Sequence, residues 1–150
     1  MCLFKKTPAE PSPITDYLWA SREEFIKICQ AQGIEPISLD TPLDSWLSIA
    51  TKTQLDTIAP FLVYPADLYI DQIVDCEDYA LKAQTDASFK FHISGVRMAL
   101  GNMPLGYHGF PLTIDKDKNI WLFEPNSGFE YAGVWFKAGE NGYLPKKVFV

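Results

Sequence analysis

Cys76 lies at the start of a predicted helix, a position that can make a cysteine nucleophilic. It follows Asp75, an N-cap residue type, and the segment 77–83 begins with acidic residues and continues with good helix formers. We therefore predict a helix over residues 76–84 with the thiol at its first position. The free N–H groups and dipole of a helix start favour a thiolate, the nucleophilic form of cysteine. The carboxylates on both sides of the thiol oppose that charge, so it needs a cationic partner such as an imidazolium.

A histidine and a glutamate are placed to act with that thiol. His108 lies near the start of a predicted strand over residues 106–114, and Glu124 directly follows a predicted strand over residues 120–123. A hairpin whose turn is centred on Asp117 pairs residues whose numbers sum to about 234, and 108 + 124 = 232. The two side chains are therefore expected to be near neighbours across the ladder. Glu124 would hold one imidazole nitrogen and leave the other for the thiol, an order of nucleophile, base and orienting acid.

The N-terminal half of the chain has helical patterning. The three prolines within residues 1–14 predict an extended lead-in. A capping box at Ser21 and a stop at Gly33 predict a helix near residues 22–32, with Cys29 in the core. Two shorter helices are predicted within residues 41–63. The first follows Thr41 and Pro42 and carries Leu43, Trp46, Leu47 and Ala50 on one stripe, and the second is capped by Thr53 and contains Leu55, Ile58 and Ala59.

After residue 90 the pattern changes to that of strands. Alternation predicts strands over 96–102, 106–114, 120–123 and 143–150. The sequence therefore predicts one α+β domain over residues 1–150, with a helical N-terminal half and a C-terminal antiparallel sheet. The turn 115–119 resembles the opening of an EF-hand loop, but Ile120 replaces the required glycine and Asn126 replaces the bidentate glutamate. We interpret it as a hairpin turn and expect no metal there.

Composition excludes several classes of protein. The 150 residues carry 13 basic and 19 acidic side chains, a net charge of −6, which disfavours nucleic acid and anionic membranes as partners. No apolar run approaches the roughly 18 residues that span a bilayer, and no apolar stretch follows the first lysines as in a secretory signal. The three cysteines are widely spaced and odd in number, which indicates reduced thiols. These features predict a cytoplasmic protein.

Three short motifs carry a resemblance to a known family. Residues 75–80 (D-C-E-D-Y-A) resemble the nucleophile motif of small papain-like cysteine peptidases, which the bacterial transglutaminase-like cysteine peptidases share. Residues 106–109 (G-Y-H-G) and 123–126 (F-E-P-N) resemble the histidine and glutamate motifs of the papain-like C-terminal domain of the agglutinin from Marasmius oreades. The similarity covers roughly residues 64–150, with the motifs in the family's order and spacing.

The resemblance implies a papain-like fold, with Cys76 as nucleophile, His108 as base and Glu124 as orienting acid. Gln72 is the candidate oxyanion donor beside the Cys76 backbone N–H, although it precedes the thiol by four residues where papain has six. The resemblance also leaves calcium open as a cofactor, but no ligand matches position by position. The agglutinin's sugar-binding β-trefoil has no counterpart in this sequence, so its lectin activity does not carry over.

The leading hypothesis is a cysteine-dependent hydrolase that cleaves an amide bond in a peptide or protein through a thioester. A second enzyme hypothesis transfers the acyl group to an amine, as transglutaminases do, since pocket access decides the acceptor. A cell-wall amidase fits less well, because that family prefers a small residue and Gly after its D-C. A third hypothesis is a non-catalytic module that binds peptide or glycan, since aromatic residues make up 14% of the chain; the apolar stripes place Trp46 and Trp121 in the core. The sequence predicts no oligomeric state.

Overall fold

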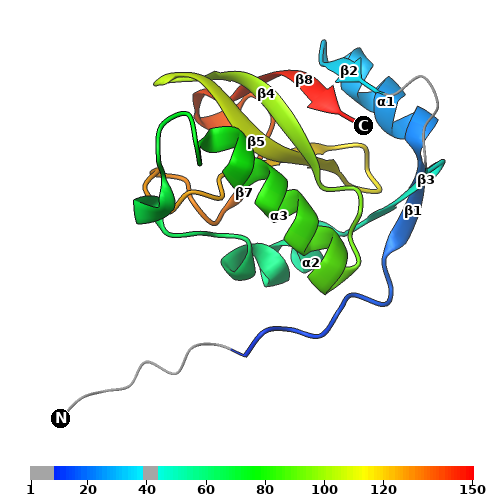
Figure 1. Cartoon of the computed structure of the whole chain (residues 1–150). Helices are drawn as coiled ribbons and strands as arrows, with labels where there is room; N and C mark the ends of the chain where they lie inside the picture. Colours follow the sequence, from blue (N-terminus) through cyan, green and yellow to red (C-terminus); the bar gives the residue numbers. More distant parts are fainter. Residues whose placement is uncertain (1–8, 39–43) are drawn as a thin grey trace.

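The computed structural model describes residues 9–38 and 44–150, in which a six-stranded sheet lies between helices (Figure 1). Helix α3 crosses one face of the sheet, and side chains of α1 pack against the other. The α-helices are α1 (Arg22–Ala31), α2 (Lys52–Ile58) and α3 (Cys76–Phe91), with short 3₁₀ turns at Ala59–Phe61, Ala66–Leu68 and Glu140–Gly142. The strands are β1 (Leu18–Ser21), β2 (Glu35–Ile37), β3 (Trp46–Ile49), β4 (Arg97–Met103), β5 (Gly106–Ile114), β6 (Ile120–Phe123), β7 (Trp135–Lys137) and β8 (Leu144–Phe149).

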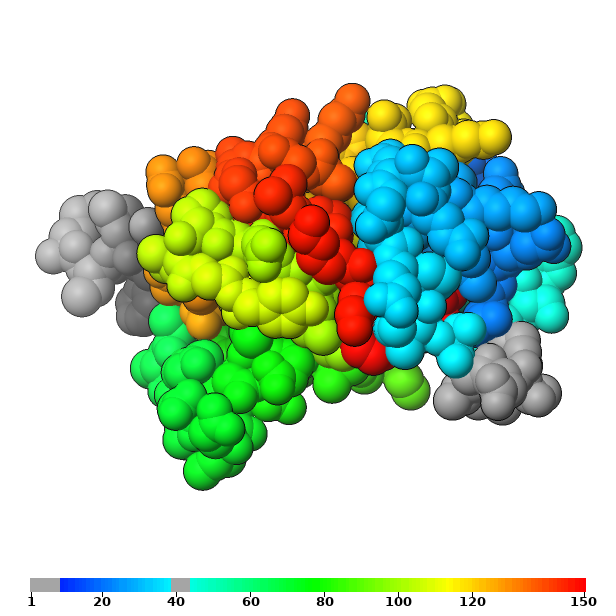
Figure 2. All heavy atoms as spheres, turned by 90° about the horizontal axis from the view of Figure 1, so that it is seen from above, coloured from blue at the N-terminus to red at the C-terminus, as the bar shows by residue number. Residues whose placement is uncertain are grey.

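The six-stranded sheet has the order β2-β8-β4-β5-β6-β7. Its neighbours are antiparallel except β2 and β8, which run parallel, so the predicted antiparallel sheet is a mixed one. Strand β2 follows α1 and has three residues, too few for a period of two to show in the sequence. In Figure 2, β8 (red) lies between the β4–β5 hairpin and the segment that contains α1 and β2.

The helix predicted after Thr41 and Pro42 is wrong in its described part. Residues 39–43, which include Leu43, lie outside the described residues, and Trp46–Ile49 form β3, paired antiparallel with β1. The structure buries the consecutive residues 47–50, whereas a surface helix would bury one stripe. Trp46 is 58% exposed, contrary to its predicted place in the core. The second short helix exists as α2, but Thr51 caps it instead of Thr53.

The two longer helices follow their predicted starts. Ser21 caps α1, its Oγ accepting a hydrogen bond from the Glu24 N–H at 3.1 Å, and Cys29 is fully buried as predicted. Helix α3 begins at Cys76 as predicted but continues past residue 84 to Phe91, because Ala83, Ala87 and Phe91 extend its buried stripe. It ends where His92 adopts a left-handed conformation.

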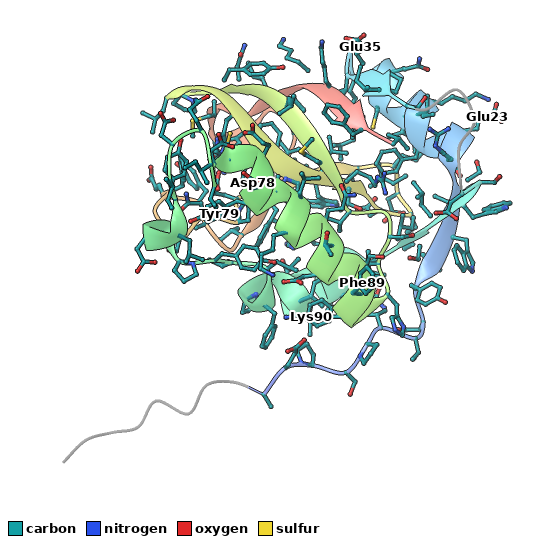
Figure 3. All side chains as sticks on the ribbon, viewed as in Figure 1. Glu23, Glu35, Asp78, Tyr79, Phe89 and Lys90 are labelled. Carbon is teal, nitrogen blue, oxygen red and sulfur yellow. The ribbon has the colours of Figure 1, made fainter. Side chains whose placement is uncertain are left out.

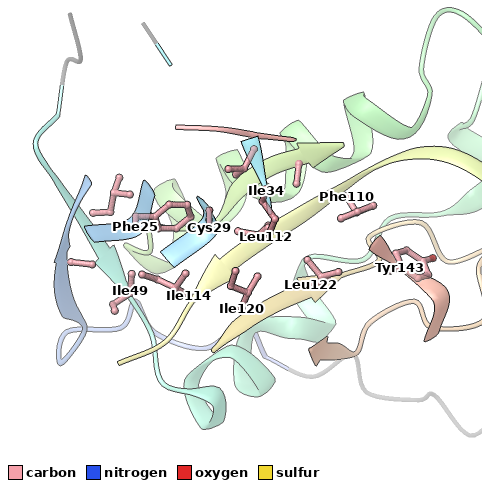
Figure 4. Packing of buried hydrophobic residues seen from close by; sticks show 14 of the residues in the cluster. Phe25, Cys29, Ile34, Ile49, Phe110, Leu112, Ile114, Ile120, Leu122 and Tyr143 are labelled. Atoms are coloured by element: carbon pink, nitrogen blue, oxygen red, sulfur yellow. The ribbon is translucent and has the colours of Figure 1, made fainter. Parts of the chain in front are cut away.

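The sheet is buried on both faces by two hydrophobic clusters. One joins α1 to β5 and includes Phe25, Cys29, Phe110 and Leu112 (Figure 4). The other fills the space between α2, α3 and the sheet. Its buried members are Ala50, Leu55, Ile58, Ala59, Leu62, Tyr64, Tyr79, Ala83, Ala87, Phe91, Ile93, Val96, Phe123 and Trp135. Strand β5 is therefore buried from His108 to its end and holds its side chains in a rigid setting.

The β5–β6 hairpin has the predicted bounds and register. Leu112 pairs with Leu122 and Ile114 with Ile120, so the numbers sum to 234 in each pair. The turn 115–119 is closed by Asp115, whose Oδ1 accepts hydrogen bonds from the Asp117 and Asn119 N–H groups. This bears out the interpretation as a hairpin turn. Among the described residues, no helix has the length and apolar character needed to cross a membrane.

Candidate active site

Cys76 is the first residue of α3 and is partly exposed. The backbone N–H of the preceding Asp75 donates to Asp78 Oδ2 at 3.1 Å, which secures the helix start. Figure 3 shows Asp78 and Tyr79 in the first turn of α3 and Phe89 and Lys90 at its other end. The Tyr79 hydroxyl donates to the Pro65 carbonyl at 2.6 Å and so ties the first turn to the loop before it. The nucleophile candidate therefore stands on an anchored helix end.

A glycine allows β5 to pass close to that helix end. A Cβ atom on Gly109 would lie 3.2 Å from both Cα and N of Glu77 and 3.4 Å from the Cys76 carbonyl carbon. These are backbone atoms that cannot rotate away. Because Gly109 directly follows His108, this close approach brings the imidazole to the thiol.

Replacing Gly109 by alanine is therefore expected to reduce the rate of Cys76 alkylation by about tenfold, since displacing a reacting pair by a fraction of an ångström costs much of its rate. The measurement compares alkylation rates and the free energy of unfolding for wild type and variant. The reading fails if the variant keeps the wild-type alkylation rate, because the glycine would then be needed only for chain packing.

His108 and Glu124 form a buried pair. His108 Nε2 lies 2.8 Å from Glu124 Oε2, and the two residues are 7% and 0% exposed. Phe129 lies over the imidazole with its ring centroid at 4.9 Å, and Phe110 packs at 6.1 Å. The expected proximity across the hairpin is thus observed. Apolar rings keep water from the pair and strengthen its electrostatic interaction.

The surroundings of His108 favour its charged form. Burial of the ring by itself lowers the pKa, but hydrogen bonding with the Cys76 thiol and with Glu124, together with the negative charge of both groups, outweighs burial and raises the pKa of His108 to about 9. Because Nε2 is engaged by Glu124, Nδ1 is the nitrogen left for the thiol. The imidazole is therefore cationic at neutral pH. It is the kind of cationic partner that we expected a thiolate at this position to need.

Acidic side chains crowd the other side of the thiol. Cys76 Sγ donates to Glu77 Oε2 at 3.3 Å. A hydrogen bond between Asp75 and Glu77 raises the pKa of Asp75 and lowers that of Glu77. The ligand atoms of these three residues lie within 4.8 Å of one another. Two carboxylates and a thiol do not match the six to eight oxygen ligands that calcium takes, so this cluster does not fit a calcium ion.

Gln72 is placed in the exposed turn before α3. Its backbone has a positive φ of 62°, and its amide donates to Asp71 Oδ1 at 3.5 Å. The structure thus brings Cys76, His108 and Glu124 together and turns the Gln72 amide to its sequence neighbour. The oxyanion role of Gln72 stays a prediction.

Sequence reasoning missed three groups around the pair of His108 and Glu124. The Tyr143 hydroxyl donates to Glu124 Oε2 at 2.9 Å, the Asn126 N–H donates to Oε1 at 3.0 Å, and Phe129 covers His108. Asn126 and Phe129 follow Glu124 by two and five residues, so the sequence could have predicted that they lie close to this pair. Tyr143 lies 19 residues further along the chain, directly before β8, and no local pattern connects it to Glu124.

Comparisons with known proteins give a structural likeness. No family model matches the chain, and no curated protein matches its sequence. A structure described as the PSL1a–E64 complex matches with a TM-score of 0.60 at 15% identity, over 89% of this chain and 51% of that one. The chain has this α+β fold. A Polyporus squamosus lectin bound to a human-type influenza-binding epitope matches with a TM-score of 0.51 at 14% identity, over 78% and 42%. The chain thus spans about half the length of the protein in the PSL1a complex.

Proposed function

We propose that the chain is a cysteine-dependent hydrolase that cleaves an amide bond of a peptide or protein with Cys76, His108 and Glu124. The observation that carries this proposal is the buried 2.8 Å contact between His108 and Glu124 beside a thiol at a helix start. The E64 complex of PSL1a supports it, because that inhibitor points to a papain-like cysteine peptidase fold in the matching protein.

The chemistry follows from the charge on the imidazole. Cys76 Sγ, as thiolate, attacks the carbonyl carbon and the C=O electron pair moves to oxygen, where the Cys76 N–H and Gln72 would donate hydrogen bonds. The oxyanion collapses, the C–N bond breaks, and the amine leaves with the proton of the His108 imidazolium. A water then gives a proton to His108 and attacks the thioester, which releases the acid and restores the thiolate and imidazolium.

A binding role is favoured by a different observation. Trp19 and Trp46 are 60% and 58% exposed and line one cavity of about 340 Å³ on the β1–β3 ladder. Exposed tryptophans can stack on a sugar or a peptide side chain. In this second candidate function the fold would serve as a binding module and Cys76 would be an ordinary thiol.

Alkylation by iodoacetamide separates the two functions. At pH 6 Cys76 is expected to react at least tenfold faster than Cys2, because the His108 imidazolium beside it favours the thiolate, the form that is alkylated. Peptide mass spectrometry of the full chain gives each rate, with buried Cys29 as the unreactive reference. Treatment with E64 is expected to protect Cys76. If Cys76 instead follows the rate of Cys2 at every pH, the hydrolase proposal is wrong and the binding module stands.

An added amine distinguishes hydrolysis from acyl transfer. With Cys76 active, a protein substrate and a small primary amine give either free carboxylic acid or the amide of that amine. We expect the acid to dominate, since the thiol is partly exposed and open to water. An excess of amide product would assign the transferase reaction.

A further inference from the structure

The hydroxyl of Tyr143 is buried against the carboxylate that holds His108. Tyr143 is 1% exposed and precedes β8, and its Oη–H donates to Glu124 Oε2 at 2.9 Å. The same oxygen accepts the bond from His108 Nε2 at 2.8 Å. One carboxylate oxygen therefore joins a group from β5 to a group that directly precedes β8.

The ring of Tyr143 is locked in place. It packs edge-on against Phe136 and Phe110, with centroid separations of 5.0 and 5.4 Å, and stands at 6.2 Å from the imidazole. Among the described residues, the remaining carboxylate oxygen of Glu124, Oε1, accepts a hydrogen bond only from the Asn126 N–H. Without the hydroxyl, the carboxylate would keep only the Asn126 N–H and the His108 imidazole as donors, and the anchored Tyr143 ring would no longer fix the position of Oε2.

We infer that Tyr143 is a positioning residue, whose hydroxyl aims Glu124 Oε2 at His108 and so keeps the imidazole facing Cys76. This inference rests on the proposed hydrolase function, since it assigns a role within that triad. Tyr143 does not touch the reacting atoms. Its contribution is the alignment of a buried acceptor that would otherwise lose the imidazole, and alignment of this kind governs much of the rate of such a site.

The direction of the effect follows from the groups that face the imidazole. They are Cys76 and Glu77 from α3, Glu124 after β6 and Tyr143 before β8. Burial opposes the charge of His108, and contacts with Glu124 and Cys76 maintain it. When Glu124 turns away, burial prevails and the pKa of His108 falls.

The chain contains two histidines, so NMR titration of the imidazole nitrogens resolves each of them. In Tyr143→Phe we expect His108 to titrate about one pH unit lower than in wild type. The matched control is Tyr64→Phe, which removes a hydroxyl from another buried carboxylate, Asp86 Oδ2 at 2.7 Å. That variant is expected to lose stability and to leave the titration of His108 unaltered.

A second pair of variants ties the effect to Glu124. In a Glu124→Gln background, Tyr143→Phe is expected to change the His108 titration no further, because coupled residues give non-additive effects. An unchanged or raised His108 pKa in Tyr143→Phe would overturn the inference, since the hydroxyl would then fill space or draw charge from the carboxylate without aiming it. Failure of the proposed function gives another result: Cys76 of the wild type reacts no faster than Cys2.

Discussion

Replacing His108 by alanine is expected to slow amide hydrolysis by about 10²–10⁴-fold at pH 7, the contribution usual for a general acid–base. The imidazole is the one cationic group found in contact with the thiol in the described chain, and it is needed twice, to protonate the leaving amine and to accept a proton from water. The measurement is the initial rate of hydrolysis of a denatured protein substrate by equal amounts of wild type and variant. Cys76 alkylation at pH 6 is expected to slow in parallel.

The matched control is the other histidine. His92 ends α3 in a left-handed conformation, which asparagine also adopts, so His92→Asn is expected to keep both the helix end and the activity. If His108→Ala hydrolyses the substrate at the wild-type rate, the base lies elsewhere and the triad is wrong.

The pH profile gives the same residue a second test. His108 is charged below its raised pKa of about 9 and neutral above it. The imidazolium donates the proton that the leaving amine takes, so activity is expected to fall as the pH rises through about 9. A profile that falls near pH 6.5, the ordinary histidine value, would mean that the contacts with Cys76 and Glu124 do not hold the charge.

Replacing Gly101 by alanine is expected to destabilise the fold by more than about 3 kcal/mol. A Cβ atom there would lie 2.7 Å from Pro145 Cα and 2.9 Å from the Leu144 carbonyl carbon, and closer still to the Leu144 carbonyl oxygen. These backbone atoms belong to β8, where the register between β4 and β8 shifts. Since β8 must move away from β4, the cost is paid in lost strand pairing.

Denaturant unfolding followed by circular dichroism measures the loss. Asn102→Ala is the control, because Asn102 is the exposed next residue of the same strand and its substitution is expected to stay within about 0.5 kcal/mol. Gly101 pairs with His108 in the sheet, so any Gly101→Ala protein that folds should also show slower Cys76 alkylation. Equal midpoints for Gly101→Ala and wild type would contradict the close approach of β8.

The part of the site that depends on short-range sequence patterns could be predicted from the sequence. The cap before Cys76 is a short-range pattern, and the register of the β5–β6 hairpin follows from its turn by arithmetic. Together they place His108 beside Glu124, where the structure has a 2.8 Å contact. The catalytic roles of these residues, and that of Gln72, stay predictions.

The rest depends on contacts between distant segments. Trp46 belongs to a segment in which apolar and polar residues do not alternate regularly, so a helical stripe fitted its apolar residues equally well. The segment forms a strand because it pairs with β1. Strand β2 is three residues long and runs parallel to β8, and no local sequence pattern predicts this pairing. Tyr143 contacts Glu124 because β8 runs beside β4. Pairing between strands so far apart in the sequence leaves no periodic pattern in either segment.

The pairing of β2 with β8 has a consequence for synthesis on the ribosome. Residues 35–37 find their partners only at residues 147–149, so the central sheet has a high contact order and closes late. Until residues 147–149 have been translated, β2 has no strand to pair with, and Tyr143 is not yet held against Glu124. A nascent chain would therefore carry the thiol of residue 76 before His108 and Glu124 are in place. Under the proposed function, amide cleavage would begin only after translation of this fold is finished.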